Sequence, residues 1–230
     1  MNLVAECAAI TERGFTILPT LFSQEVTDQI LEEIAKLSPH RSRAGVRHAL
    51  GLDPVGKIAR CPQLITLASA VLGADAFPFR ATLFDKTQAA NWLVVWHQDT
   101  ALPLRERQEL PGWGPWSVKE GIKYAHAPAT ALSQVLALRI HFDDSRCENG
   151  PLRVLPGTHK LGVLSDDQIH DLSRRIPPVD CVAAKGGVVA MRPLVVHSSS
   201  KSQIDIPRRV LHIEYAASES IAAPLRLASA

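Results

Sequence analysis

The chain has 230 residues, of which 25 are Lys or Arg and 23 are Asp or Glu. The resulting formal net charge of +2 argues against nucleic acid or an anionic membrane as a partner. The four cysteines form no C-x-x-C pair, which argues against a zinc ribbon or a redox dithiol. No signal-peptide pattern and no apolar run of about 18 residues is present, so we expect a cytoplasmic protein that forms one domain, residues 1–230.

Residues 1–75 predict a helical support region with one short strand at 14–19. Ser23 is a good N-cap for a first helix, whose expected apolar stripe comprises Val26, Ile30, Ile34 and Leu37. A second helix is expected to open at Cys61-Pro62 and to stop at Gly73, because Pro suits the first turn of a helix and Gly suits its end.

From residue 76 the pattern changes to short strands separated by turn residues such as Asn149-Gly150-Pro151. Candidate strands cover 77–86, 92–97, 133–143, 151–155, 179–184, 187–192 and 207–216. A helix at 165–175 interrupts them and begins with the capping box Ser165-Asp-Asp-Gln168. We expect a mainly β fold with helices, an antiparallel sandwich or jelly roll (residues 76–217) with the N-terminal helices packed on one sheet.

Two of these strands each have one apolar and one polar face. In 207–216 the residues Arg208, His212 and Glu214 alternate with Leu211, Ile213 and Tyr215. In 133–143, Arg139 and His141 alternate in the same way with leucine and isoleucine. The apolar faces are suited to pack on the helices, so the polar faces are expected to line water or a polar cavity.

The stretch Trp96-His97-Gln98-Asp99 ends an apolar run, and the i, i+2 spacing aims His97 and Asp99 the same way from an extended backbone. A second imidazole from another strand would complete a set of two His and one carboxylate, the usual ligand set of non-haem Fe(II) in oxygen-using enzymes. His141-Phe142-Asp143 has the same spacing, so spacing alone does not choose between the two pairs. Context favours His97 and Asp99, which enter a long loop where ligands can converge.

The candidate for the second imidazole is His197, which follows the apolar run Pro193-Leu-Val-Val196. A histidine in that position is by itself more often structural than a ligand. Arg208 lies at the start of the next strand and on its polar face, where a guanidinium can grip a carboxylate with two parallel hydrogen bonds.

Together, Trp96–Asp99, the stretch 148–160 with its Asn-Gly-Pro turn, His197-Ser-Ser199 and Arg208-Arg209 resemble the phytanoyl-CoA dioxygenase family. The resemblance covers roughly residues 75–217 with four motifs in the same order. It implies a double-stranded β-helix that uses Fe(II), 2-oxoglutarate and O2, hydroxylates an unactivated C–H bond of a small-molecule substrate, and releases succinate and CO2. It also places His97-Gln98-Asp99, rather than His141-Phe142-Asp143, at the iron motif.

Transferred residue by residue, the resemblance implies that His97, Asp99 and His197 bind iron. Arg208 would pair with the distal carboxylate of 2-oxoglutarate, assisted by the Ser199 hydroxyl. Arg139 and Thr82 would touch the co-substrate, although many relatives have an aromatic residue in place of Arg139, which could instead meet an anionic substrate.

The segment 100–131 is expected to be a long loop that closes over the site as a lid, because Trp113 and Trp116 favour packing over a floppy linker. The alternative is a surface hairpin.

Two further functions remain open from the residues alone. One is another metal-dependent jelly-roll enzyme, such as a zinc hydrolase or a cupin-type isomerase. The other is a non-catalytic β-sandwich binding protein.

Overall fold

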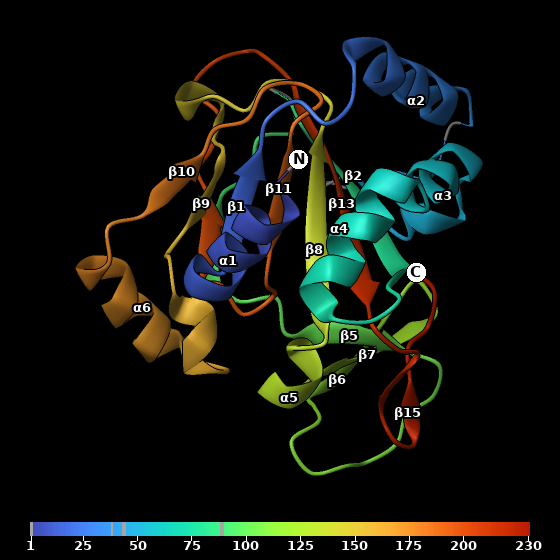
Figure 1. The fold of residues 1–230 in the computed structure, drawn as a ribbon, viewed down its shortest axis with the longest axis vertical. Coiled ribbons are helices and arrows are strands. Elements are labelled where there is room, and N and C mark those ends of the chain that lie inside the picture. The colour runs from blue at the N-terminus through green and yellow to red at the C-terminus, as the bar shows by residue number, and fades with distance from the viewer. Residues whose placement is uncertain (1, 38, 43–44, 88–89) are drawn as a thin grey trace.

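The computed structural model describes residues 2–37, 39–42, 45–87 and 90–230, and its centre is a pair of facing β-sheets (Figure 1). The larger sheet is antiparallel, in the order β1-β11-β8-β13-β3-β2. Its strands are β1 (Phe15–Leu18), β2 (Gly45–Val46), β3 (Phe77–Lys86), β8 (Val135–His141), β11 (Val188–Met191) and β13 (Arg208–Ala216).

The smaller sheet is also antiparallel, in the order β10-β9-β12-β4. It contains β4 (Val94–His97), β9 (Leu152–Val154), β10 (Val179–Cys181) and β12 (His197–Ser199). The two sheets enclose a cavity lined by residues of both, so the predicted jelly roll and its mainly β class are confirmed.

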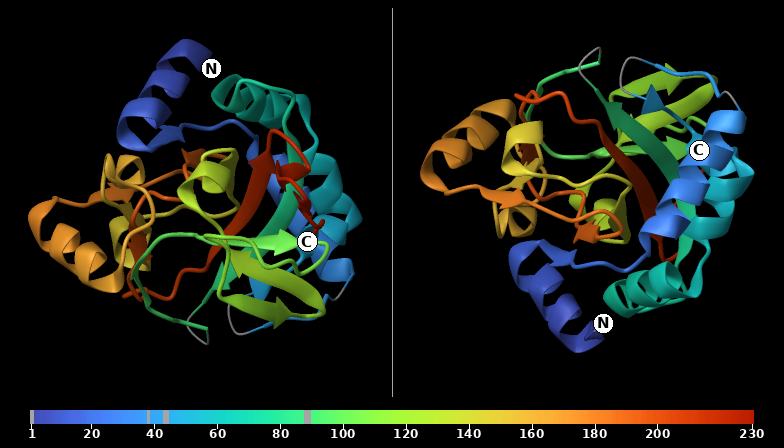
Figure 2. Two further views of the ribbon diagram at one scale, coloured as in Figure 1. Left: turned by 90° about the horizontal axis from the view of Figure 1, so that it is seen from below. Right: turned by 90° about the horizontal axis from the view of Figure 1, so that it is seen from above.

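The helices are α1 (Leu3–Arg13), α2 (Gln24–Lys36), α3 (Asp53–Ala59), α4 (Pro62–Leu72), α5 (Ala129–Leu132) and α6 (Asp166–Arg175). The capping box at Ser165 forms as predicted, and α4 ends at Gly73 in the left-handed conformation. Figure 2 shows α6 beside the smaller sheet and α2–α4 on the opposite side of the barrel.

The main core lies between α1–α4 and the outer face of the larger sheet, as the alternating pattern predicted. The buried apolar side chains of β8 and β13 on this face are Leu136, Leu138, Ile140, Leu211, Ile213 and Tyr215. Tyr215 also donates its hydroxyl to the Ala59 carbonyl at the end of α3, at 2.8 Å. This packing leaves the polar faces of the same strands to line the interior of the barrel.

The expected stripe of α2 is only half right. Ile30 and Ile34 are buried, but Val26 is 41% exposed and Leu37 is 51% exposed. Val26 lies in the first turn and Leu37 at the C-cap, and Thr27 is the third buried residue of the helix.

The segment 100–131, which we expected to be a long packed loop, contains strands. It contains β5 (Ala101–Leu104), β6 (Trp116–Lys119) and β7 (Ile122–His126), which form a separate sheet in the order β5-β7-β6. Trp113 is buried against this sheet and against the C-terminal hairpin of β14 (Ser220–Ala222) and β15 (Leu225–Arg226). The tryptophans therefore indicated packing correctly, while the role of the segment as a lid stays a prediction.

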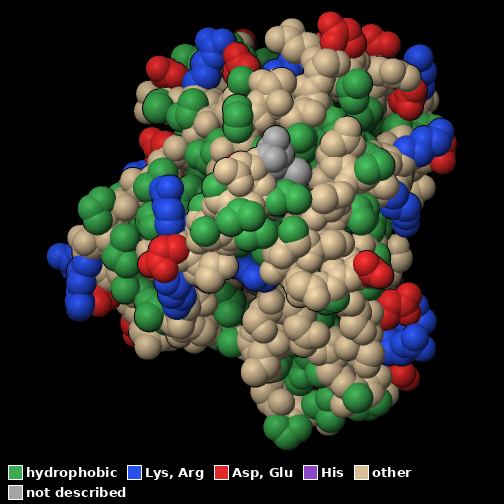
Figure 3. Space-filling model, viewed as in Figure 1, with side chains coloured by type: hydrophobic (Ala, Val, Ile, Leu, Met, Phe, Trp, Pro, Cys, Tyr) green, Lys and Arg blue, Asp and Glu red, His purple; other side chains and the backbone are tan. Residues whose placement is uncertain are grey.

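Charged side chains do not gather by sign on the face drawn in Figure 3, where acidic and basic groups are interspersed among the side chains shown in colour. This distribution fits the near-balanced composition. None of the helices in the described ranges has the length and apolarity to span a membrane.

Candidate active site

The three predicted metal ligands meet at the open end of the smaller sheet. Strands β4 and β12 are neighbours, and their register pairs His97 with His197, so the two imidazole rings lie 4.2 Å apart between centroids. Asp99 follows β4, and its carboxylate oxygens lie 3.6 Å from Nε2 of His97 and 3.5 Å from Nε2 of His197. One potential ligand atom from each residue lies within 4.8 Å of the others, which is the spacing of a metal site.

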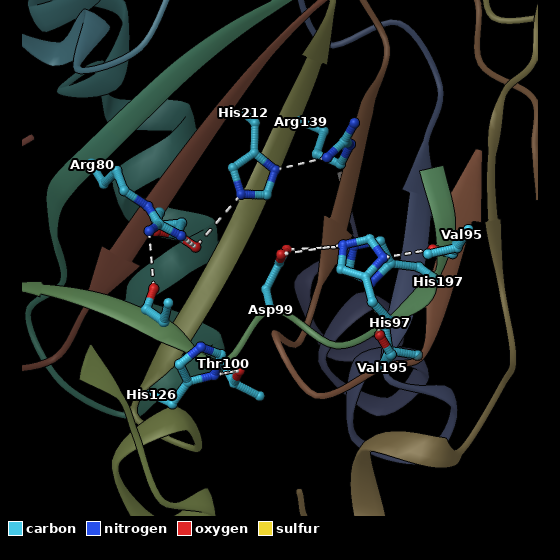
Figure 4. A network of polar contacts seen from close by, with 12 residues as sticks. Arg80, Val95, His97, Asp99, Thr100, His126, Arg139, Val195, His197 and His212 are labelled. Carbon is cyan, nitrogen blue, oxygen red and sulfur yellow. Dashed lines mark hydrogen bonds and ion pairs between the residues drawn. The ribbon is translucent and has the colours of Figure 1, made fainter. Parts of the chain in front are cut away.

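Both imidazoles are held in the tautomer that a metal requires. Nδ1 of His97 lies 2.9 Å from the Val95 carbonyl, and Nδ1 of His197 lies 2.9 Å from the Val195 carbonyl (Figure 4). Because a carbonyl only accepts, each Nδ1 must carry the proton and donate. In the neutral form of each ring, Nε2 is then the unprotonated atom that can bind a metal, and both Nε2 atoms lie beside the Asp99 carboxylate.

The charge states of these groups also suit a metal. Burial alone would raise the pKa of Asp99, but His197 and His97 hold it well below its usual range. Burial lowers the pKa of His197 to about 4. The Asp99 carboxylate and the neutral imidazole of His197 are forms that bind a divalent cation. Burial would lower the pKa of His97, but its hydrogen bond to Asp99 and the charge of Asp99 raise it, so a proton and a metal compete for this imidazole.

Gln98, between the two ligands of the motif, fixes the loops that carry them. Its side-chain nitrogen donates to the Leu194 and Gly162 carbonyls at 2.7 and 2.9 Å, and its oxygen accepts from the Leu164 N–H at 2.9 Å. The Asp99 N–H donates to the Pro193 carbonyl at 3.0 Å. These bonds join the segment after β4 to the segment before β12, so the two histidines are positioned together.

A cavity of about 190 Å³ between the two sheets contains the site. It is lined by all seven of the residues that the sequence singled out, namely Thr82, His97, Asp99, Arg139, His197, Ser199 and Arg208. Apolar side chains of Phe84, Trp92, Val94 and Leu152 complete its walls. Such a cavity, apolar with a few convergent polar groups, has the character of a small-molecule site.

The end of this cavity away from Asp99 is positively charged. Arg208 is 4% exposed and donates to the Ser199 hydroxyl at 3.1 Å, and that hydroxyl bonds the Gly150 carbonyl at 2.8 Å. Lys86 is 1% exposed and donates to the same Ser199 hydroxyl at 3.0 Å. Within the described part of the chain, neither cation forms a salt bridge with a carboxylate, so this end of the cavity is suited to bind an anion.

Lys86 is a buried cation beside the cavity that sequence reasoning did not single out. It lies opposite Arg208 in the register of β3 and β13. Burial, and then the nearby Arg208, lower the pKa of its ammonium to about 7. A signal was available, because the period of two in the strand 77–86 places Lys86 on the same face as Thr82 and Phe84.

Arg139 belongs to a buried polar network that crosses the larger sheet (Figure 4). Its guanidinium donates to Nδ1 of His212 at 2.8 Å, so the His212 proton stands at Nε2, which lies 3.6 Å from the Glu214 carboxylate. Glu214 in turn pairs with Arg80, which also donates to the Ala101 carbonyl at 3.0 Å. The network fixes Arg139 in the cavity wall but supplies no carboxylate to it directly.

The second His-x-Asp motif, His141-Phe142-Asp143, has a structural role. His141 is buried and bonds the Ser145 hydroxyl at 2.9 Å, and burial lowers its pKa to about 3. Asp143 accepts three hydrogen bonds from Arg209, two from the guanidinium and one from the backbone. Neither residue lines the cavity, which agrees with the choice of His97 and Asp99.

Comparison with known proteins identifies the family. The model of the phytanoyl-CoA dioxygenase family matches residues 10–210. The chain belongs to the phytanoyl-CoA dioxygenase family. It is 27% identical to an L-proline trans-4-hydroxylase of Streptomyces griseoviridis over 69% of this chain and 61% of the relative. It is 24% identical to an ectoine dioxygenase of Bordetella parapertussis over 64% of this chain and 46% of the relative.

A solved structure shows the same fold. The epimerase SnoN from nogalamycin biosynthesis, in complex with Fe3+, alpha ketoglutarate and nogalamycin RO, aligns with a TM-score of 0.70 and 20% identity. The alignment covers 94% of this chain and 84% of that protein. In sequence, the chain spans less than two thirds of the length of the two curated relatives named above.

Proposed function

We propose that this protein is an Fe(II)- and 2-oxoglutarate-dependent dioxygenase in which His97, Asp99 and His197 hold the metal. The observation that carries the proposal is that both imidazoles donate Nδ1–H to a backbone carbonyl, so both Nε2 atoms converge on one carboxylate. Three protein ligands on one side of the ion leave the other positions free for ligands that react, as non-haem Fe(II) oxygenases require.

In this proposal the distal carboxylate of 2-oxoglutarate binds between Arg208, Lys86 and the Ser199 hydroxyl. The two buried cations would then gain the anionic partner that the described residues do not provide. Arg139 and Thr82 would contact the rest of the co-substrate, because both line the same cavity.

The bound metal and co-substrate supply the oxidative chemistry, in which O2 and 2-oxoglutarate yield succinate, CO2 and an oxidised C–H bond. The protein's part is to hold the co-substrate by its distal carboxylate, to orient its other end toward Asp99 and the two histidines, and to exclude water. Phe84, Trp92 and Leu152 serve the last purpose as apolar walls of the cavity.

We propose hydroxylation of a small molecule as the reaction. A proline hydroxylase and an ectoine dioxygenase among the relatives support it, and L-proline and ectoine are the first compounds to test. A zinc hydrolase or cupin-type isomerase would explain the three metal ligands, but it gives no role to Arg208, which lines the far end of the cavity, or to Lys86, which donates to Ser199 there.

The test compares Asp99→Ala with Asp143→Asn, which alters the second His-x-Asp motif outside the cavity. Anaerobic Fe(II) and 2-oxoglutarate should give the wild type a visible charge-transfer band, and aerobic incubation with a substrate should release succinate. Asp99→Ala should lose both and bind Fe(II) more than about 100-fold more weakly, whereas Asp143→Asn should retain both. Full turnover by Asp99→Ala would refute the ligand assignment.

A further inference from the structure

A second cavity of about 270 Å³ meets the first at the metal ligand Asp99. Arg80, Thr82, Phe84 and Asp99 line both cavities. The first cavity leads from Asp99 to the anion-binding end at Arg208, and the second leads from Asp99 to Arg47, Lys119 and His126. If the first cavity holds 2-oxoglutarate, the second is where a substrate approaches the metal.

The second cavity is strongly unbalanced in charge. Its lining contains three basic residues, Arg47, Arg80 and Lys119, and among the described residues that line it the one carboxylate is Asp99, which would bind the metal. Arg80 forms an ion pair with Glu214, which neutralises its charge. Among the residues that the structure describes, Arg47 and Lys119 form no ion pair, and the carboxylate of Glu120, next to Lys119 in the chain, lies 3.4 Å from Nδ1 of His48 instead.

Lys119 is exposed, but its ammonium has an aromatic neighbour. Its ammonium lies 4.9 Å from the centroid of the Tyr124 ring, and the Arg80 guanidinium lies 5.7 Å from the same centroid. The Tyr124 ring is itself fixed, because its hydroxyl lies 3.0 Å from Nε2 of His48. Burial, together with the charges of Arg47 and Arg80, lowers the pKa of Lys119, as expected for a cation held among other cations.

We propose that the substrate carries a carboxylate, and that Arg47 and Lys119 bind this group at the mouth of the second cavity while the reacting carbon lies near Asp99. This inference rests on the proposed function and names the substrate class for it. A cavity of about 270 Å³ offers room for a small acid beside Asp99. The carboxylate would supply the missing charge, and a guanidinium is well shaped to bind it.

The test uses a panel of small carboxylic acids, each matched with its primary amide, so that the members of a pair differ by one negative charge. Binding is measured by the shift in unfolding temperature of the anaerobic protein loaded with Fe(II) and 2-oxoglutarate, and turnover is measured by succinate release. We expect acids to bind at least about tenfold more tightly than their amides. Amides that bind equally well, or a panel in which no acid binds, would overturn the proposal.

The variants Arg47→Gln and Lys119→Gln should each weaken binding of the best acid at least about tenfold, with the affinity for 2-oxoglutarate unchanged. Lys123→Gln is the matched control, because Lys123 is an exposed lysine of β7 that lines neither cavity. If the two variants instead weaken 2-oxoglutarate and spare the acid, these cations guide the co-substrate and the proposal is wrong. A protein that binds neither Fe(II) nor 2-oxoglutarate would refute the proposed function itself, which separates the two failures.

Discussion

Lys86 makes the binding of 2-oxoglutarate depend on pH in a direction that the structure fixes. Its pKa in the free protein is about 7, so an increasing share of Lys86 is uncharged as the pH rises above 7. A carboxylate bound beside Ser199 favours the charged ammonium, and therefore binding must take up a proton. The dissociation constant for 2-oxoglutarate should rise above neutral pH, by roughly 16-fold between pH 7 and pH 8.5.

Isothermal titration of 2-oxoglutarate, with Mn(II) in place of Fe(II), measures this effect without turnover. Titrations in buffers of different ionisation enthalpy count the protons, and uptake should approach one proton per 2-oxoglutarate near pH 8. In Lys86→Met the profile should become flat across this range, and at pH 7 the affinity should fall roughly 10- to 100-fold, because one charge-assisted hydrogen bond is lost. Lys123→Met removes an exposed lysine and should keep the wild-type profile.

A wild-type dissociation constant that stays constant between pH 7 and pH 8.5, with no proton uptake, would refute this reasoning. It would mean that the Lys86 ammonium does not meet the ligand. Loss of the pH dependence in Lys123→Met as well would place the titrating group elsewhere.

Two further predictions test neighbouring parts of the site. Arg208→Gln should raise the KM for 2-oxoglutarate at least about 100-fold while sparing metal affinity. Arg209→Gln, which loses the two guanidinium bonds to Asp143, should lower the unfolding temperature and leave that KM unchanged. An unaltered KM in Arg208→Gln would mean that another cation binds the distal carboxylate of 2-oxoglutarate. The second prediction concerns stability: Gly150→Ala should destabilise the protein by about 2 kcal/mol or more in denaturant titrations. The reason is that φ of Gly150 is +66° and an added Cβ would lie 2.2 Å from the Ser200 carbonyl oxygen. Gly51→Ala, which meets no neighbouring atom, should change stability by less than about 0.5 kcal/mol, and equal effects of the two would contradict the steric argument.

The sequence predicted the elements whose signals are local. The strand at 77–86 has the predicted bounds, and the capping box begins α6 at Ser165, because alternation and capping depend only on nearby residues. The inward face of β13 was also predicted from alternation alone. Lys86 was missed because its importance comes from pairing with Arg208, and that pairing depends on which strands become neighbours and in which register.

The strands in 100–131 were missed for a related reason. β5 contains Pro103, and the segment between β5 and β6 contains Pro111, Gly112 and Gly114, so the local signals indicate a loop. The sheet is stabilised by packing against residues from the other end of the chain, since Leu104 forms a bridge with Leu227 and both are buried in one cluster. Contacts between segments so distant in sequence cannot be read from either segment alone.

The burial of the cations distinguishes the two ends of the site. Arg208 and Lys86 are almost fully buried, so a carboxylate placed between them interacts strongly, and each is costly to the fold while it has no partner. That cost suits a co-substrate that is the same in every reaction cycle and binds in one fixed pose. Arg47 and Lys119 are exposed, so their interaction with an anion is weaker and more adaptable, and replacing them should change substrate preference with little effect on stability.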